Sequence, residues 1–220
     1  MIRLSFFAVA AIVVLGVAAP ASQAGVQVGV SADQDGINSF YLAIGEQYRV
    51  PEREVVVVRD RKVPDDELPV VFFLARRARV EPGVIVDLRL GGQSWMDIAL
   101  HYHLSPEIFY VHFDRDPGPP YGRAWGYYKN HKRAEWGKIR LADDDIVNVV
   151  NLKFMSERYG CAPSDVVQRR AKGDDFVVIN GEFRAKKDHG KHDHNSVASS
   201  EHSKGKSNGK GHGKGHGSKD

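Results

Sequence analysis

The chain has 220 residues, which at about 150 residues per domain leaves room for one folded domain with extensions. Its hydrophobic content of 42% and aromatic content of 10% lie near the average of globular proteins, so wholesale disorder is excluded. The net charge of +3 is unevenly distributed, because residues 184–220 hold nine Lys/Arg against four Asp/Glu. The single cysteine, Cys161, excludes an intramolecular disulfide framework and a cysteine-based zinc finger.

Residues 1–24 have the pattern of a secretory signal peptide. One positive charge at Arg3 precedes an apolar run over residues 6–19, and small residues at Ser22 and Ala24 suit a cleavage site. Pro20 ends the apolar run before it reaches the roughly 20 residues that a membrane-spanning helix needs. We therefore expect no transmembrane segment after processing.

The mature chain is expected to begin at Gly25, with Ala21 as the alternative, and to continue through a linker over residues 25–37. Secretion places the protein in a periplasm, on a cell surface or outside the cell. Such a location argues against ATP-driven chemistry and against genomic nucleic acid as a partner.

Helical hairpins are predicted over residues 38–112 and 142–170, within a mainly α-helical domain spanning residues 38–183. Four times, an apolar helical stretch leads into a short turn with a proline, and a second apolar stretch follows. Proline at a first helical position supplies a suitable φ and loses no needed hydrogen bond. The shared pattern predicts burial of Tyr48, Val50, Leu74, Val80, Ile98, Tyr102, Leu104, Met155, Tyr159 and Cys161.

Residues 114–140 are predicted to form a long Pro/Gly-rich loop that also carries aromatic and basic side chains. The segment Asp116–Gly122 cannot continue a helix. Long loops in compact domains are usually functional or disordered, and so much aromatic area argues against disorder. The candidate ligand-binding residues are Tyr121, Arg123, Trp125, Tyr127, Tyr128, Lys129 and Trp136.

Residues 176–183 suggest a small β-hairpin that closes the domain. Apolar residues flank the pair Asn180 and Gly181, and Asn-Gly between apolar runs is a hairpin-turn signal. The expected fold class is therefore mainly α, with this possible C-terminal β-hairpin.

Residues 184–220 are expected to form a disordered, basic tail rich in His, Gly and Lys. From His189 onward the chain has no large apolar residue except Val197, so no core can form there. Neutral imidazoles could bind Zn²⁺, Ni²⁺ or Cu²⁺, while the lysines could attract a polyanion. A solubilising tail without a specific ligand explains the same composition. The candidate metal ligands are His189, His192, His194, His212 and His216.

Other residues suggest chemistry but have simpler structural explanations. His101 and His103 are two residues apart on an expected helix, so they face different directions and are expected in solvent. Cys161 aligns with apolar turn residues, which favours burial over a reactive thiol. Asp143, Asp144 and Asp145 precede an apolar run without EF-hand spacing, so they are expected to stabilise a helix N-terminus.

Residues 92–109 resemble the first half of a LysM peptidoglycan-binding module. The resemblance rests on the run from Gly92 to Ala99 and on the apolar positions that follow it, with Gln93 in place of the usual acidic residue. A generic helical hairpin accounts for the same residues. The chain as a whole resembles secreted bacterial proteins with Gly/His/Lys-rich tails, which implies a cell-envelope setting and no particular activity.

Three function classes remain open. The first is a secreted or periplasmic, non-catalytic envelope protein that binds a glycan or other polyanion, such as an envelope polysaccharide. The second is a metal-binding protein that uses the tail histidines. The third is an enzyme with an unrecognised site near the aromatic segment, although the chain has no nucleophile elbow, zinc-protease helix, phosphate loop or dinucleotide fingerprint.

Overall fold

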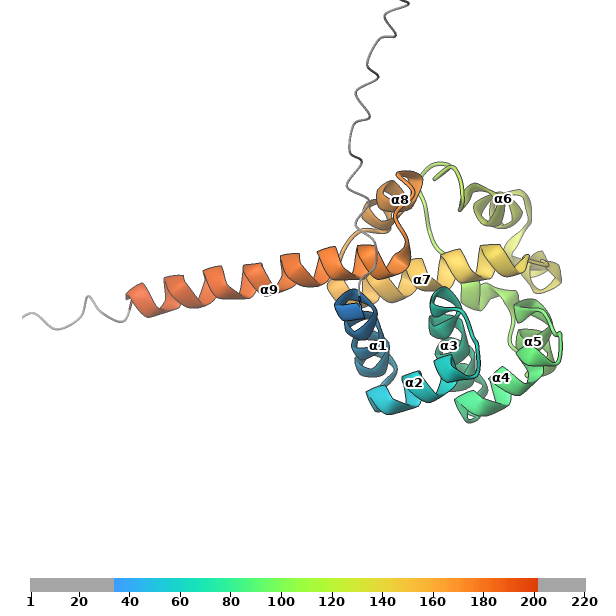
Figure 1. Ribbon diagram of the computed structural model, residues 1–220. Helices are drawn as coiled ribbons and strands as arrows, with labels where there is room; N and C mark the ends of the chain where they lie inside the picture. The colour runs from blue at the N-terminus through green and yellow to red at the C-terminus, as the bar shows by residue number, and fades with distance from the viewer. Residues whose placement is uncertain (1–33, 202–220) are drawn as a thin grey trace, which may run out of the picture. The chain divides into compact units, whose positions relative to one another are not determined.

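The computed structural model describes residues 34–201, with side chains through residue 189, and its described part is helical without a strand (Figure 1). Successive helices pair as hairpins, and the predicted mainly α-helical fold class is confirmed. The paired helices are α1 (Gln34–Tyr48) with α2 (Glu52–Asp60), α3 (Leu68–Ala78) with α4 (Pro82–Leu90), α5 (Trp95–His101) with the 3₁₀ helix η2 (Pro106–Phe109), and α7 (Asp143–Tyr159) with α8 (Pro163–Ala171).

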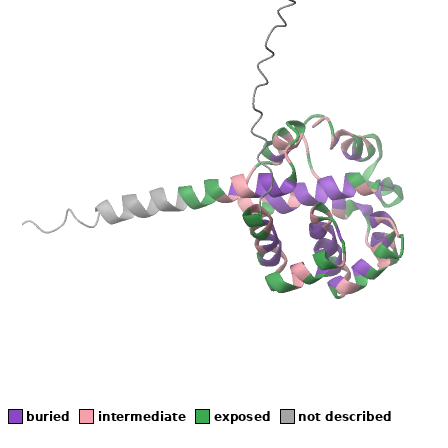
Figure 2. Ribbon diagram, in the orientation of Figure 1, coloured by how far each residue is buried: buried purple, intermediate pink, exposed green. Residues whose placement is uncertain are grey.

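Helix α7 forms the centre of the core. It contacts α1, α3, α5, α6 and α8 as well as α9, and buried residues follow one another around its circumference (Figure 2). A helix that is apolar on most sides belongs in the interior of a domain. Its buried polar residue Asn151 is hydrogen-bonded, since Nδ2 donates to the Val147 carbonyl at 2.9 Å and to the Asp66 carbonyl at 2.7 Å. The second bond ties α7 to the turn that precedes α3.

The hairpin turns share one backbone geometry. In the first, Arg49 lies in the left-handed region with a φ of 61°, and the next residue, Val50, donates its N–H to the Gly45 carbonyl at 2.9 Å. This is a Schellman closure, which satisfies a carbonyl at the end of the helix. The remaining left-handed residues at the equivalent positions are Arg79, His103 and Gly160.

The expected core positions are only in part fully buried. Leu74, Ile98 and Met155 are buried in the interior. The other seven pack against the core but remain half-buried, because they lie in or beside the hairpin turns at the edge of the domain. These half-buried residues are Tyr48, Val50, Val80, Tyr102, Leu104, Tyr159 and Cys161.

The predicted β-hairpin at residues 176–183 is wrong, because this segment begins α9 (Phe176–Glu201). Asp175 accepts the Val178 N–H at 2.8 Å through its carboxylate and so caps the first turn. Phe176, Ile179 and Phe183 are buried at helical spacing. Burial of one helical face outweighs the local turn preference of an Asn-Gly pair.

The predicted loop at residues 114–140 is also largely helical. After the Pro/Gly-rich stretch the chain forms α6 (Gly122–Asn130) and the 3₁₀ helix η3 (Arg133–Lys138). Ala124 and Tyr128, four residues apart, bury one face of α6. Packing of this face overrides the weak helix preference of the glycines and aromatic residues around it.

Helix α9 continues through residues 184–201, which the sequence assigned to the disordered tail. Figure 2 shows that burial along α9 falls off after Phe183. Lys187 still touches the domain, since its Nζ donates to the Arg158 carbonyl at 2.9 Å. Residues 1–33, which hold the expected signal peptide and most of the expected linker, and residues 202–220 lie outside the described residues.

Within residues 34–201, none of the helices combines the length and the apolar composition needed to cross a membrane.

Candidate functional site

The structure separates the aromatic residues that the sequence grouped as a ligand site. Tyr121, Tyr128 and Trp136 are buried. The Tyr128 hydroxyl donates to the Pro106 carbonyl at 2.7 Å, and the Trp136 ring lies 5.0 Å from that of Tyr128 and 4.5 Å from that of Tyr110. These rings attach η3 and α6 to the α5–η2 hairpin, so they are core residues without a free face for a ligand.

The remaining members of the predicted set reach the surface on α6. Tyr127 is 38% exposed and Trp125 is half-buried, with the Lys129 ammonium 5.1 Å from the centre of the Trp125 ring. Arg123 is engaged in a two-oxygen contact with Asp145, at 2.8 and 2.9 Å. None of the clefts described below is lined by Trp125 or Tyr128, so the structure does not give these two residues a common site.

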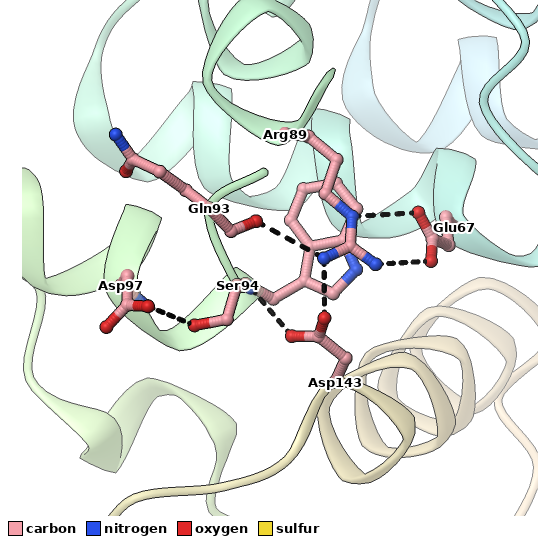
Figure 3. A network of polar contacts seen from close by, with 7 residues as sticks. Glu67, Arg89, Gln93, Ser94, Asp97 and Asp143 are labelled. Carbon is pink, nitrogen blue, oxygen red and sulfur yellow. Dashed lines mark hydrogen bonds and ion pairs between the residues drawn. The ribbon is translucent and has the colours of Figure 1, made fainter. Parts of the chain in front are cut away.

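A polar network connects four elements through Arg89 of α4 (Figure 3). The Arg89 guanidinium contacts both oxygens of Glu67, at 2.8 and 3.2 Å, and also the Asp143 carboxylate. Asp143 accepts the Trp95 N–H at 2.8 Å through its other oxygen, and Arg89 lies 4.5 Å above the Trp95 ring. One guanidinium faces two carboxylates, which leaves a net charge of −1, but each of these charged groups is hydrogen-bonded. The network therefore fixes the start of α5 and of α7.

Beside this network lies an acidic cleft of about 730 Å³ at the N-terminus of α7. Burial first, and then the neighbouring Glu67 carboxylate, raise the pKa of Asp66 in its wall. Asp145, whose side chain is 1% exposed, is neutralised by Arg123 and accepts the Ala142 N–H at 3.1 Å. The expected role of these acids in stabilising the start of α7 agrees with this geometry. Within the described residues, no three His, Cys, Asp or Glu side chains come together as a metal site.

A basic cleft of about 470 Å³ lies between the end of α7, α8 and α9, and we call it the α8–α9 cleft. Lys172, Lys186 and Lys187 line it, and none of the three has a carboxylate partner within the described part of the chain. By contrast, Arg169 in the same cleft is paired with Asp174 and Glu182. Asp165 also lines the cleft, so its three lysines exceed this one carboxylate and give the cleft an excess of positive charge.

Cys161 also lines the α8–α9 cleft and is half-buried there. Burial raises the pKa of its thiol. Its Sγ lies 3.8 Å from the Met155 carbonyl oxygen. Because the thiolate is the reactive form of cysteine, this environment favours the packing role over a reactive one.

The histidines are dispersed. His101 at the end of α5 and His103 in the turn are both exposed, as expected. His189 is exposed on α9. The side chains of His192 and His194, and all of His212 and His216, lie outside the described residues, so the predicted metal site stays a prediction.

Sequence reasoning missed the α8–α9 cleft because its lysines come from separate helices. Lys172 ends α8, whereas Lys186 and Lys187 lie one turn beyond the last buried residue of α9. Only the packing of α8 against α9 brings them together. The available signal was the excess of Lys/Arg that begins at residue 184.

Comparison of the chain with protein-family models, with curated proteins and with solved structures found no significant match.

Proposed function

We propose that this is a secreted, non-catalytic cell-envelope protein that binds a polyanionic glycan through the α8–α9 cleft. The observation that carries the proposal is the cluster of Lys172, Lys186 and Lys187 around one concave surface without carboxylate partners. Converging like charges repel each other, and a bound polyanion relieves that repulsion. The signal peptide expected at residues 1–24 supports an envelope location.

The sequence beyond the cleft extends the same charge. Lysines and histidines dominate residues 189–220, with few acidic residues among them. A basic segment next to a basic cleft raises the local concentration of a polyanion by long-range attraction, without requiring a defined structure. The cleft then supplies the contacts that fix the bound chain.

The ring faces of the cleft suit a sugar polymer. Tyr159 and Phe183 line its floor, and the ammonium groups of Lys187 and Lys186 lie 5.7 and 5.6 Å from the respective ring centres. Each ammonium group thus lies over a ring of the cleft, and the Lys187 Nζ also donates to the Arg158 carbonyl at 2.9 Å. The cleft therefore combines cations with apolar surface, as an anionic polysaccharide requires.

The proposal is tested with heparin as the anionic probe and dextran as the neutral control, by titration calorimetry at several salt concentrations. The triple variant Lys172→Gln, Lys186→Gln and Lys187→Gln is expected to weaken heparin binding roughly tenfold or more and to reduce its salt dependence. Dextran is expected to bind neither protein.

A matched control removes three exposed lysines that lie outside the cleft, through Lys62→Gln, Lys132→Gln and Lys138→Gln. Both triple variants change the net charge equally, so a site-specific effect appears only in the first. Equal weakening in both would show non-specific attraction to the net charge, and unchanged affinity in the first would remove the cleft as the binding site.

A further inference from the structure

A second basic cleft, of about 360 Å³, lies between α1, α3 and α7 and shares no lining residue with the α8–α9 cleft. Its cations are Arg76 and Arg77 from the end of α3 and Lys153 from the middle of α7. Aromatic residues also line it, namely the buried Phe73 and Phe154 and the half-buried Tyr48, whose ring stacks on that of Phe154 at 6.2 Å. We call it the α3–α7 cleft.

The guanidinium groups of the two arginines are unpaired in the described part of the chain. Neither Arg76 nor Arg77 forms an ion pair or a hydrogen bond within the described part of the chain, and the Arg77 guanidinium lies 4.4 Å above the Phe73 ring. Stacking on a ring leaves the in-plane N–H donors of a guanidinium free to bind an anion. The two arginines thus offer donors to the cleft.

Lys153 is the deepest cation of the three. It is half-buried, and its Nζ has one hydrogen bond, to the Tyr110 carbonyl at 3.1 Å, although an ammonium group has three donors. Burial, and then the charge of Arg77, lower the pKa of Lys153. The charge of Glu157 acts in the opposite direction, so the folded chain compensates the charge of Lys153 only in part.

The acidic side of the α3–α7 cleft is a single residue, Glu157, whose carboxylate accepts the Gln47 Nε2 at 3.1 Å. Three cations against this one carboxylate leave a net charge of +2 around the cleft. A phosphomonoester carries close to two negative charges at pH 7 and offers three acceptor oxygens. Its charge therefore matches that of the cleft, whereas a carboxylate supplies half of it.

The volume of the α3–α7 cleft limits the size of the molecule that carries the phosphate group. A volume of about 360 Å³ is at the lower end of the range for small-molecule sites, roughly 300–1,000 Å³. From the unpaired Arg76, Arg77 and Lys153 around this small cleft, we infer that it binds a phosphomonoester on a molecule the size of a single sugar.

The inference is tested by titration calorimetry with glucose 6-phosphate as the probe, and with glucose and glucuronate as controls. The full chain is expected to bind glucose 6-phosphate with a dissociation constant below about 1 mM, and to bind glucose not at all. Binding is expected to weaken below pH 6, where the phosphate loses its second charge. Glucuronate binding as tight as that of the phosphate would overturn the inference.

The double variant Arg76→Gln and Arg77→Gln is expected to weaken binding at least tenfold, and Lys153→Met to do the same. The matched control for the arginine double variant is Arg53→Gln with Arg115→Gln, two exposed arginines outside the cleft. Thermal unfolding of each variant establishes that it is folded. Unchanged affinity in the folded variant of Arg76 and Arg77, or an equal loss in the control double variant, would overturn the inference.

The triple lysine variant of the α8–α9 cleft separates this site from the proposed polyanion site. It is expected to bind glucose 6-phosphate as the wild type does, because it leaves Arg76, Arg77 and Lys153 in place. Loss of phosphate binding in that variant would assign the phosphate to the α8–α9 cleft and refute the α3–α7 site.

Discussion

Arg123 of α6 holds the buried carboxylate of Asp145 in the first turn of α7, with Nε 2.8 Å from one oxygen and 2.9 Å from the other. The same carboxylate accepts the Ala142 N–H at 3.1 Å and so satisfies a backbone donor at the helix start. One side chain thus joins two elements that lie far apart in the sequence.

Asp145→Asn is expected to destabilise the fold by about 1.5–3 kcal/mol, because a hydrogen bond to a charged group is lost from a buried position. Arg123 is half-exposed, so its charge returns to water and the cost stays below that of a fully buried pair. Urea unfolding of the variant and of the wild type measures this difference in the free energy of unfolding. The neighbouring change Asp144→Asn removes an exposed acid from the same turn and is expected to cost only about 0.3–1 kcal/mol. Equal costs for the two variants would contradict the structural role of Asp145.

Asp66 provides a prediction about pH. Its pKa is raised above 3.8 in the folded state, first by burial and then by Glu67, so the folded chain holds its proton more tightly than the unfolded chain does. Above the raised pKa the ionised carboxylate opposes folding, and below pH 3.8 both states are protonated and the effect disappears. Asp66→Asn is therefore expected to raise the thermal midpoint at pH 7 and to leave it unchanged at pH 3.

The adjacent Asp65 is the contrasting control. Its carboxylate accepts the Tyr41 hydroxyl at 2.7 Å, so Asp65→Asn weakens a bond between η1 (Asp65–Glu67) and α1. This variant is expected to lower the midpoint at pH 7. A lower midpoint in Asp66→Asn at pH 7 as well would show that Asp66 stabilises the fold and would refute its pKa shift.

The hairpins could be predicted from the sequence because local chemistry specifies them. The prolines that follow Val50, Val80, Leu104 and Cys161 set the start of each second helix, and an apolar residue closes each turn against the core. Each of these signals depends only on residues close together in the chain, so it can be recognised from the sequence alone. The left-handed residues Arg49, Arg79 and His103 were not foreseen, because arginine and histidine do not mark that conformation as glycine does at Gly160.

Neither the basic clefts nor the burial of the aromatic segment could be predicted. Arg77 and Lys153 lie on different helices and meet only through the packing of α3 against α7. A sequence in which aromatic residues alternate with basic ones is compatible both with a binding surface and with the edge of a core. The hydrogen bond from the Tyr128 hydroxyl to the Pro106 carbonyl shows that Tyr128 belongs to the core. Such information depends on tertiary contacts that no short stretch of sequence contains.

Gly181 distinguishes the observed helix from the hairpin that the sequence suggested. It lies inside α9, and a Cβ added there meets no atom within 4 Å. Gly181→Ala is therefore expected to stabilise the fold by about 0.5–1 kcal/mol, since alanine is the better helix former. In an Asn-Gly hairpin turn the same glycine would need a positive φ, and alanine would destabilise it.

The control for Gly181 is Gly173, in the turn after α8, which has a φ of 93°. Gly173→Ala is expected to destabilise the fold by about 1–2 kcal/mol, because an L-residue is strained in that conformation. Urea unfolding of both variants gives opposite signs if α9 starts at Phe176. Destabilisation by Gly181→Ala would instead favour the turn.

The tail histidines are expected to bind divalent transition metal weakly. His189, His192 and His194 lie on α9, and their side chains must give up rotamer freedom to close a chelate, which opposes binding. Metal binding requires deprotonated ligands, so it is lost as the pH falls. Binding of Ni²⁺ is therefore expected to be measurable at pH 7 and to vanish near pH 5.

The contribution of the tail to metal binding is measured by titration calorimetry with Ni²⁺ on the full chain and on a chain that ends at Lys187. The shorter chain is expected to bind no metal and to keep its thermal midpoint, because the residues removed contribute almost no apolar area to the core.

Equal heats from both chains would exclude the tail as the metal site. Retained binding by the shorter chain would direct attention to the exposed side chains of His101, His103, His112 and His131. A dissociation constant below about 1 µM that is lost on shortening would make metal binding, rather than polyanion binding, the main function of the tail.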